Sequence, residues 1–162
     1  MGKEKKGEKR RAILVAIVLA ALVLAAVAFG VRDGWLGGAK VVLSEAYYGE
    51  FTDYQDLSVE KYEELVGKSD SFVLFVDQGG CETAERLRGF VKDWASEKEV
   101  KVQRIMFSEM KKTSLHEFVK YYPSVVVVEK GKVRAFLRAD SDEDADIYND
   151  YEKFKGWIEK YI

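Results

Sequence analysis

The stretch FVLFVDQGGCETAERL, residues 72–87, decides the fold class because it joins a buried strand to an amphipathic helix. The run FVLFV consists of β-forming apolar residues, which is typical of a central strand covered on both faces. Two glycines end the run. Beyond them, Ala84, Leu87 and Trp94 recur at helical spacing. The sequence therefore predicts a strand, a glycine loop and a helix whose start carries Cys81, the only cysteine of the chain.

Outward from this unit, hydrophobic spacing and capping residues assign most of the chain. Further helices are predicted where apolar residues recur behind a capping residue or an acidic loop: 58–67, 114–122 and a C-terminal helix after 140–146. Strands are predicted at 40–43, 100–107, 125–128 and 133–137. The last two form a hairpin around a two-residue Lys-Gly turn. Residues 46–55 have no clean period and stay unassigned. A strand–helix–strand unit indicates a parallel pair, so the prediction is an α/β fold with a mixed sheet.

The N-terminal segment predicts a membrane anchor. Residues 12–31 contain no charge, and as a helix of about 1.5 Å per residue they would span roughly 30 Å. Residues 1–11 carry six basic and two acidic side chains, a local charge of +4. Because basic residues stay inside, we expect a cytoplasmic tail over 1–11, a single-pass transmembrane helix over 12–31, a linker and irregular lead-in over 32–56, and an extracytoplasmic domain over 57–162.

A cleaved signal peptide with secretion is the alternative for this segment. Ala26-Val27-Ala28 matches the A-x-A pattern of a cleavage site, but the apolar run is longer than a usual signal sequence and continues past it. Both interpretations place the domain outside the cytoplasm, where disulfides persist. Since the chain has one cysteine, any disulfide must join Cys81 to another molecule, so we expect a protein or peptide thiol partner.

Composition excludes several classes of function. Residues 32–162 carry 20 basic and 26 acidic side chains, a local charge of −6, which disfavours nucleic acid as a partner. One histidine, His116, and one cysteine cannot build a zinc site, and no metal or cofactor is predicted. The acidic loop 140–146 alternates carboxylates as calcium loops do, but Ala145 and Tyr151 stand where such loops need glycine and glutamate. A solvated loop is the simpler interpretation.

Over residues 57–162 the chain resembles a thioredoxin-fold domain, which is a three-layer sandwich. The resemblance is carried by the apolar strand before Cys81, by Pro123 directly before an apolar strand, by the hairpin VVVVEKGKVRAFL and by the amphipathic C-terminal helix. It implies that Pro123 follows a cis peptide bond and faces the thiol. The anchored arrangement is also similar to the bacteriocin-transport-accessory type of thioredoxin-like protein.

The departures from that family fall at its chemistry. The family motif is Cys-x-x-Cys, whereas this chain has Cys81-Glu82-Thr83-Ala84 and lacks the resolving thiol. Gly80 replaces the usual tryptophan, and Phe75 replaces the buried carboxylate, with Asp77 nearby but not at the matching place.

The resemblance implies catalytic roles for Cys81 and Pro123, and substrate-binding positions at Gly80, Glu82, Tyr122 and Ser124. A helix N-terminus favours a thiolate, while Glu82 and Glu85 oppose it. The leading expectation is monothiol thiol–disulfide exchange or peptide binding. The alternative is a non-catalytic interaction module with an inert cysteine.

Overall fold

The structure is a computed structural model that describes residues 39–162, and residues 40–162 form one folded unit. The predicted tail over 1–11 and the predicted transmembrane helix over 12–31 lie outside the described residues. Within 39–162, no helix combines the length and the apolar character needed to cross a membrane.

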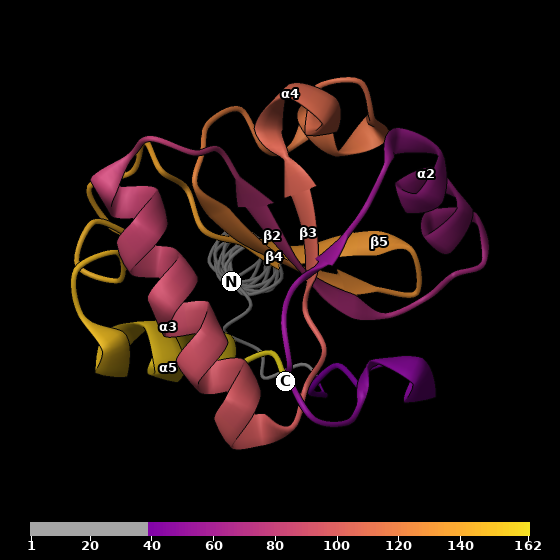
Figure 1. Cartoon of the computed structure of the whole chain (residues 1–162), viewed down its shortest axis with the longest axis horizontal. Coiled ribbons are helices and arrows are strands. Elements are labelled where there is room, and N and C mark those ends of the chain that lie inside the picture. Colours follow the sequence, from indigo (N-terminus) through magenta and orange to yellow (C-terminus); the bar gives the residue numbers. More distant parts are fainter. Residues whose placement is uncertain (1–38) are drawn as a thin grey trace, which may run out of the picture. The chain divides into compact units, whose positions relative to one another are not determined.

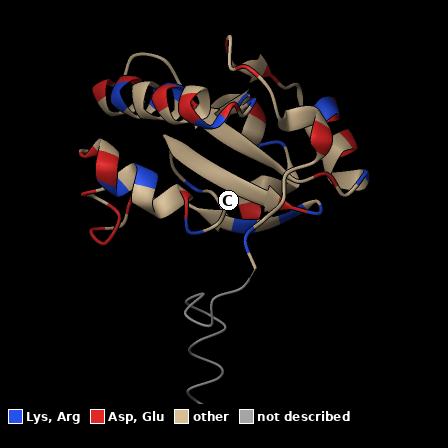
Figure 2. Cartoon of the chain, turned by 90° about the horizontal axis from the view of Figure 1, so that it is seen from below, with Lys and Arg blue, Asp and Glu red and all other residues tan. Residues whose placement is uncertain are grey.

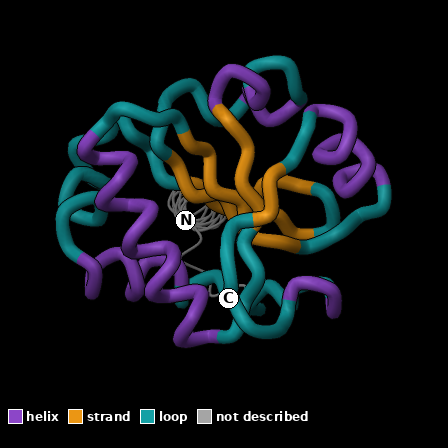
Figure 3. Tube along the Cα trace, in the orientation of Figure 1, coloured by secondary structure: helices purple, strands orange, loops and turns teal. Residues whose placement is uncertain are grey.

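A five-stranded mixed sheet with strand order β1-β3-β2-β4-β5 forms the centre of this unit (Figures 1 and 3). Its strands are β1 (Gln55–Asp56), β2 (Phe72–Asp77), β3 (Gln103–Met106), β4 (Ser124–Glu129) and β5 (Lys132–Phe136). β1, β3 and β2 run parallel, whereas β4 is antiparallel to both β2 and β5. Every residue of β2 is buried, as its continuous apolar run predicts for a central strand.

Helices lie on both sides of the sheet: α2 (Val59–Gly67), α3 (Glu82–Lys98), α4 (Phe107–Met110) and α5 (Tyr151–Ile158), with 3₁₀ turns η1 (Glu45–Tyr47) and η2 (Ser114–Glu117). α3 and α5 contact each other on one side, and α2 lies on the other (Figure 1). Acidic and basic residues are distributed along the helices and loops, while the central strands are mostly uncharged (Figure 2). The apolar core therefore lies between the sheet and the inner faces of the helices.

Local sequence signals account for the helices and the hairpin that were predicted. The Ser58 hydroxyl accepts the Lys61 N–H at 3.2 Å and caps α2, and Asp150 caps α5 by accepting the Lys153 N–H at 3.1 Å. The two-residue turn between β4 and β5 places Lys130 at φ 49° and Gly131 at φ 73°, the left-handed values that a tight hairpin turn requires.

Two predicted elements are wrong. Residues 40–43 form no strand, because their backbone makes isolated bonds to separate segments, Val41 N–H to Tyr161 O (2.6 Å) among them. The helix predicted over 114–122 is only the short turn η2, and Thr113 rather than Ser114 caps it. The chain must turn back into β4 here, so a long helix has no room. The one-turn helix α4 was not predicted.

The lead-in segment is part of the folded unit. Among residues 40–56, the side chains of Val41, Leu43, Tyr47 and Phe51 are buried in the core. Tyr48 pairs with Val100 as an isolated bridge, and β1 adds an edge strand to β3. Residues 46–55 show no period because tertiary contacts, rather than a regular helix or a long strand, hold this backbone. The folded unit consequently begins before residue 57.

Candidate functional site

Cys81 occupies the N-cap position of α3. Its backbone is extended, with φ −124° and ψ 124°, and its carbonyl accepts the Glu85 N–H at 3.0 Å. The thiol makes no capping hydrogen bond and is half-buried. Because the first N–H groups of a helix lack partners within the helix, the thiol lies where negative charge is favoured. This is a position in which a thiol can act as a nucleophile.

The thiol lines a hollow of about 470 Å³ together with Tyr122, Pro123 and the acidic loop that precedes α5. The register of the sheet explains why Pro123 and Cys81 lie close together. Val76, near the end of β2, pairs with Ser124 at the start of β4, so Pro123 lies beside the loop leading to Cys81. The Tyr122–Pro123 peptide bond is cis. The buried Tyr148 hydroxyl donates to the Pro123 carbonyl at 2.9 Å and attaches the acidic loop to this wall.

Tyr122 is one of the residues that line the hollow. Its ring packs on Phe107, with centroids 4.8 Å apart, which holds the segment before Pro123 in place. Among the described residues, neither the N–H nor the C=O of Tyr122 has a hydrogen-bond partner. A peptide unit of this kind can pair with an extended chain, as an open strand edge does.

The other residues predicted for substrate binding are not among those that line the hollow. Gly80, with φ 83°, belongs to the exposed loop before α3. Glu82 is exposed and pairs with Arg86 at 2.8 Å. Ser124 is fully buried, and its hydroxyl donates to the Leu137 carbonyl at 2.7 Å, so its side chain is not accessible. The structure thus brings together Cys81, Tyr122 and Pro123 of the predicted set.

The positions that distinguish this chain from dithiol thioredoxins are apolar and buried. Ala84, where a resolving cysteine would stand, is fully buried in the first turn of α3. Phe75, where a carboxylate would stand, is fully buried in β2. Cys81 therefore has neither a second thiol nor a carboxylate at those two positions.

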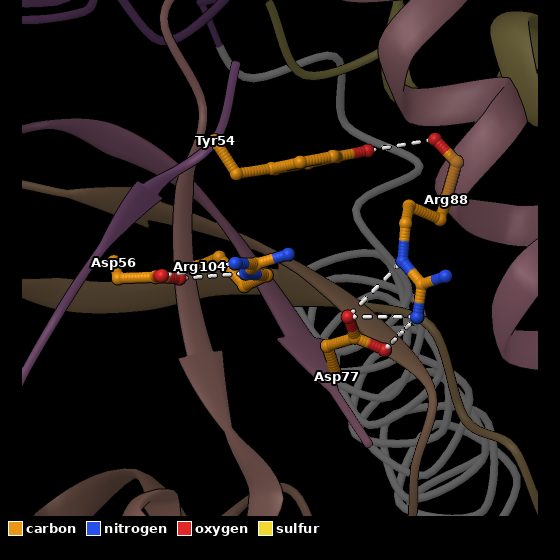
Figure 4. A network of polar contacts seen from close by, with 5 residues as sticks. All are labelled: Tyr54, Asp56, Asp77, Arg88 and Arg104. Atoms are coloured by element: carbon orange, nitrogen blue, oxygen red, sulfur yellow. Dashed lines mark hydrogen bonds and ion pairs between the residues drawn. The ribbon is translucent and has the colours of Figure 1, made fainter. Parts of the chain in front are cut away.

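A polar network that was not predicted attaches α3 to the sheet (Figure 4). Asp77, at the end of β2, has a side chain only 3% exposed, and Arg88 of α3 binds both its oxygens at 2.9 and 3.0 Å. The hydrogen bond to Asp77 raises the pKa of Arg88. The Tyr54 hydroxyl donates to the Arg88 carbonyl at 2.7 Å, and burial raises the pKa of Tyr54. The network fixes the helix that carries Cys81.

Next to it, Arg104 of β3 binds the two oxygens of Asp56 at 2.6 and 2.9 Å (Figure 4). This hydrogen bonding lowers the pKa of Asp56. The pair joins β1 to β3 across the parallel register. Within residues 39–162, no three His, Cys, Asp or Glu side chains are grouped so that they could hold a metal ion.

The structure contains all four features on which the family resemblance depends. A central strand leads to Cys81 at a helix start, a cis-proline precedes the antiparallel β4, a hairpin closes the sheet, and α5 ends the chain. The fold is thioredoxin-like. It is an α/β fold with a mixed sheet, as predicted.

The sequence matches no protein-family model and no curated protein. Solved structures similar to the chain include three thioredoxins. The oxidised thioredoxin from Plasmodium falciparum has 16% identity and a TM-score of 0.49, covering 67% of this chain and 98% of that one. A mutant thioredoxin from Halobacterium salinarum has 17% identity and a TM-score of 0.48, covering 68% of this chain and 95% of that one. Thioredoxin from Trypanosoma brucei brucei has 15% identity and a TM-score of 0.47, covering 73% of this chain and 99% of that one.

Proposed function

We propose that this chain is a membrane-anchored, extracytoplasmic thioredoxin-like protein that performs monothiol exchange with a protein or peptide partner. The observation that carries the proposal is the convergence of three groups on one hollow: the half-buried thiol of Cys81, the wall formed by Pro123, and the unpaired backbone of Tyr122. The backbone would align an extended segment, and the thiol would meet its disulfide.

The exchange step is a displacement at sulfur. The Cys81 thiol loses its proton to solvent, and the thiolate attacks one sulfur of a partner disulfide. One S–S bond forms to Cys81, the original S–S bond breaks, and the second partner sulfur leaves as a thiolate. Because Ala84 offers no second thiol, release of the captured partner requires an external thiol, either a small-molecule thiol or a thiol of another protein.

The proposed membrane location and orientation are inferred from the sequence. The uncharged segment 12–31 has the length of a bilayer core, and the +4 charge of residues 1–11 favours a cytoplasmic N-terminus. A membrane-impermeant maleimide should label Cys81 in intact cells, and the labelled chain should stay with the membranes after an alkaline carbonate wash. Labelling only after lysis would contradict the orientation, and release by the wash would contradict the anchor.

Thiol reactivity tests the chemistry. The full chain, kept in a non-ionic detergent because of segment 12–31, is mixed at pH 6 and pH 8 with a peptide whose cysteine carries a thionitrobenzoate group. We expect each wild-type chain to release one thionitrobenzoate from the peptide, and at pH 6 the folded chain should do so faster than the same chain unfolded in urea. The variant Cys81→Ser should release none. A folded chain that reacts no faster than the unfolded one would favour the non-catalytic interaction module.

Ala84→Cys tests whether the surroundings of Cys81 support dithiol chemistry. The new thiol lies one helical turn from Cys81, so the variant should reduce insulin with dithiothreitol as the electron source, whereas wild type and the size-matched Ala84→Ser should not. If Ala84→Cys folds, as judged by circular dichroism, and reduces nothing, the surroundings of Cys81 are not redox-competent.

A further inference from the structure

We propose that the hollow beside Cys81 accepts an extended protein segment that carries Lys or Arg next to its disulfide-bonded cysteine. This inference rests on the proposed function, for which it names the class of partner. Two uncompensated carboxylates beside the thiol and the shape of the surface around it carry the argument.

The carboxylates of the acidic loop fall into two groups, those paired with a basic side chain and those that are not. Arg138 pairs with Glu143 at 2.6 Å and Asp144 at 3.6 Å, and Lys153 pairs with Asp146 at 2.5 Å. Asp140 and Asp142 instead line the hollow together with Cys81, and within the described part of the chain neither has a basic side chain within 4.0 Å. A partner cation entering the hollow therefore meets two carboxylates that no arginine or lysine of the domain already neutralises.

The surface favours an extended polypeptide over a small cation. The hollow includes apolar atoms of Tyr122, Pro123 and Ala145 and has a volume of about 470 Å³, far more than a metal ion occupies. A second hollow, of about 140 Å³, shares Ala139 and Asp140 with the first and is also lined by two exposed aromatic side chains and by the basic residues Lys120 and Arg138.

Those aromatic side chains are Phe118, 50% exposed, and Tyr121, 55% exposed. The continuous surface thus offers carboxylates, then apolar rings, next to the unpaired backbone of Tyr122. An extended segment with a basic residue near its cysteine and an apolar residue beyond it would contact all three.

Electrostatic attraction at this exposed place should be moderate and sensitive to salt. Exposed charge pairs contribute little each, and a Debye length of about 10 Å at 0.1 M salt weakens them further. With two carboxylates, we expect a basic segment to bind roughly threefold to tenfold more tightly than a neutral one at low ionic strength, and an acidic segment to bind more weakly still.

Calorimetry with the full chain carrying Cys81→Ser, in non-ionic detergent, tests this preference without thiol chemistry. Three peptides share one sequence, with serine for cysteine and a leucine beyond it, and differ only in two flanking residues: lysines, glutamines or glutamates. Titration into empty micelles is subtracted. We expect affinities in the order Lys, Gln, Glu in 20 mM salt, converging in 0.5 M salt. Equal affinities at low salt would overturn the inference.

The double variant Asp140→Asn/Asp142→Asn, made in the same Cys81→Ser chain, locates the effect. It should remove the preference for the lysine peptide, so that the lysine and glutamine peptides bind with equal affinity. The matched control Glu45→Gln/Glu50→Gln changes the net charge equally in the segment whose Gly49 N–H donates to the Glu99 carbonyl, at the far end of α3, about 25 Å from Cys81. A preference that persists in the first variant, or disappears in the control, would overturn the inference.

The two proposals fail separately. Cys81→Ser cannot exchange thiols, so an inert thiol in the wild type would refute monothiol exchange while leaving the charge preference measurable. A reactive thiol with no charge preference would refute the partner class and leave the exchange chemistry intact.

Discussion

At the scale of the residue, the pair Asp77–Arg88 matters most for stability because one partner is buried. The Asp77 side chain is 3% exposed, while that of Arg88 is 31% exposed. Arg88→Ala would leave a buried carboxylate without its partner, which costs several kcal/mol in fully buried pairs. Given the partial exposure of Arg88, we expect the free energy of unfolding to fall by about 2–3 kcal/mol, measured by urea denaturation.

Arg86 provides the matched control on the same helix. It pairs with Glu82, whose side chain is 87% exposed. Exposed pairs contribute little, so Arg86→Ala should lower the free energy of unfolding by less than about 0.5 kcal/mol. In a double-mutant cycle, Asp77→Asn should relieve much of the loss in Arg88→Ala. Equal losses in the two arginine variants would contradict the role given to Asp77.

At the scale of the element, the β4–β5 hairpin depends on the glycine of its turn. Gly131 has φ 73°, and a Cβ built there would lie 2.4 Å from the Val66 carbonyl oxygen. Its N–H donates to Asp70 O at 2.8 Å and fastens the turn to the segment after α2. We expect Gly131→Ala to lower the free energy of unfolding by about 1–3 kcal/mol through strain and steric overlap, as measured by thermal or urea denaturation.

Gly156 offers the opposite case within α5. A Cβ there meets no atom within 4 Å, and its backbone is helical. Gly156→Ala should therefore raise the free energy of unfolding by about 0.5–1 kcal/mol, because alanine loses less backbone entropy in a helix. If both glycine variants destabilise alike, the close approach of the turn to Val66 is not what makes Gly131 necessary.

At the scale of the whole molecule, the segment before α2 completes the core. A chain beginning at residue 40 keeps the whole folded unit and should unfold cooperatively. A chain beginning at residue 57 lacks Val41, Leu43, Tyr47 and Phe51, each worth about 1.5–3 kcal/mol of burial. That sum is comparable to the whole stability of a domain, so the shorter chain should be unfolded by near-UV circular dichroism. Equal stability of the two chains would contradict this.

Alkaline pH should destabilise the molecule through its buried tyrosines. Burial, and next the neighbouring Asp70, raise the pKa of Tyr47 from 10.0 to about 12, and burial also raises the pKa of Tyr148. Between pH 10 and 12 the unfolded chain has lost a proton that the folded chain keeps, so the free energy of unfolding falls as pH rises. Below pH 10 this contribution is fully present.

We expect the urea midpoint of the wild type to drop between pH 10 and 12. Tyr47→Phe should make that drop shallower, because the variant lacks the hydroxyl whose pKa burial raises. Tyr47→Phe also loses the 3.3 Å hydrogen bond to Asp70, which lowers stability at neutral pH by about 0.5–1.5 kcal/mol. If the urea midpoint of Tyr47→Phe falls as steeply between pH 10 and 12 as that of the wild type, the pKa of Tyr47 is not raised by folding.

The amino-acid sequence by itself determined those elements whose signals are local. The apolar run of β2, the periodic face of α3, the Lys130-Gly131 turn and the Asp150 cap each depend on residues within a few positions of one another. Hydrophobic periodicity and turn chemistry act over that range, so these elements followed from them, and their order along the chain carried the resemblance to the thioredoxin fold. The same locality places Cys81 at the start of α3.

Except for the approach of Pro123 to Cys81, which the family resemblance implied, tertiary structure alone decided where segments distant in sequence meet. The register of β4 against β2 brings Pro123 to the Cys81 loop, the Tyr148 hydroxyl holds the acidic loop against that wall, and Arg88 reaches back to Asp77. The helix expected after residue 114 was cut to a single turn, and irregular residues 40–56 joined the core. Packing and long-range hydrogen bonds outweigh local preference at such places, since their partners lie in other elements of the fold.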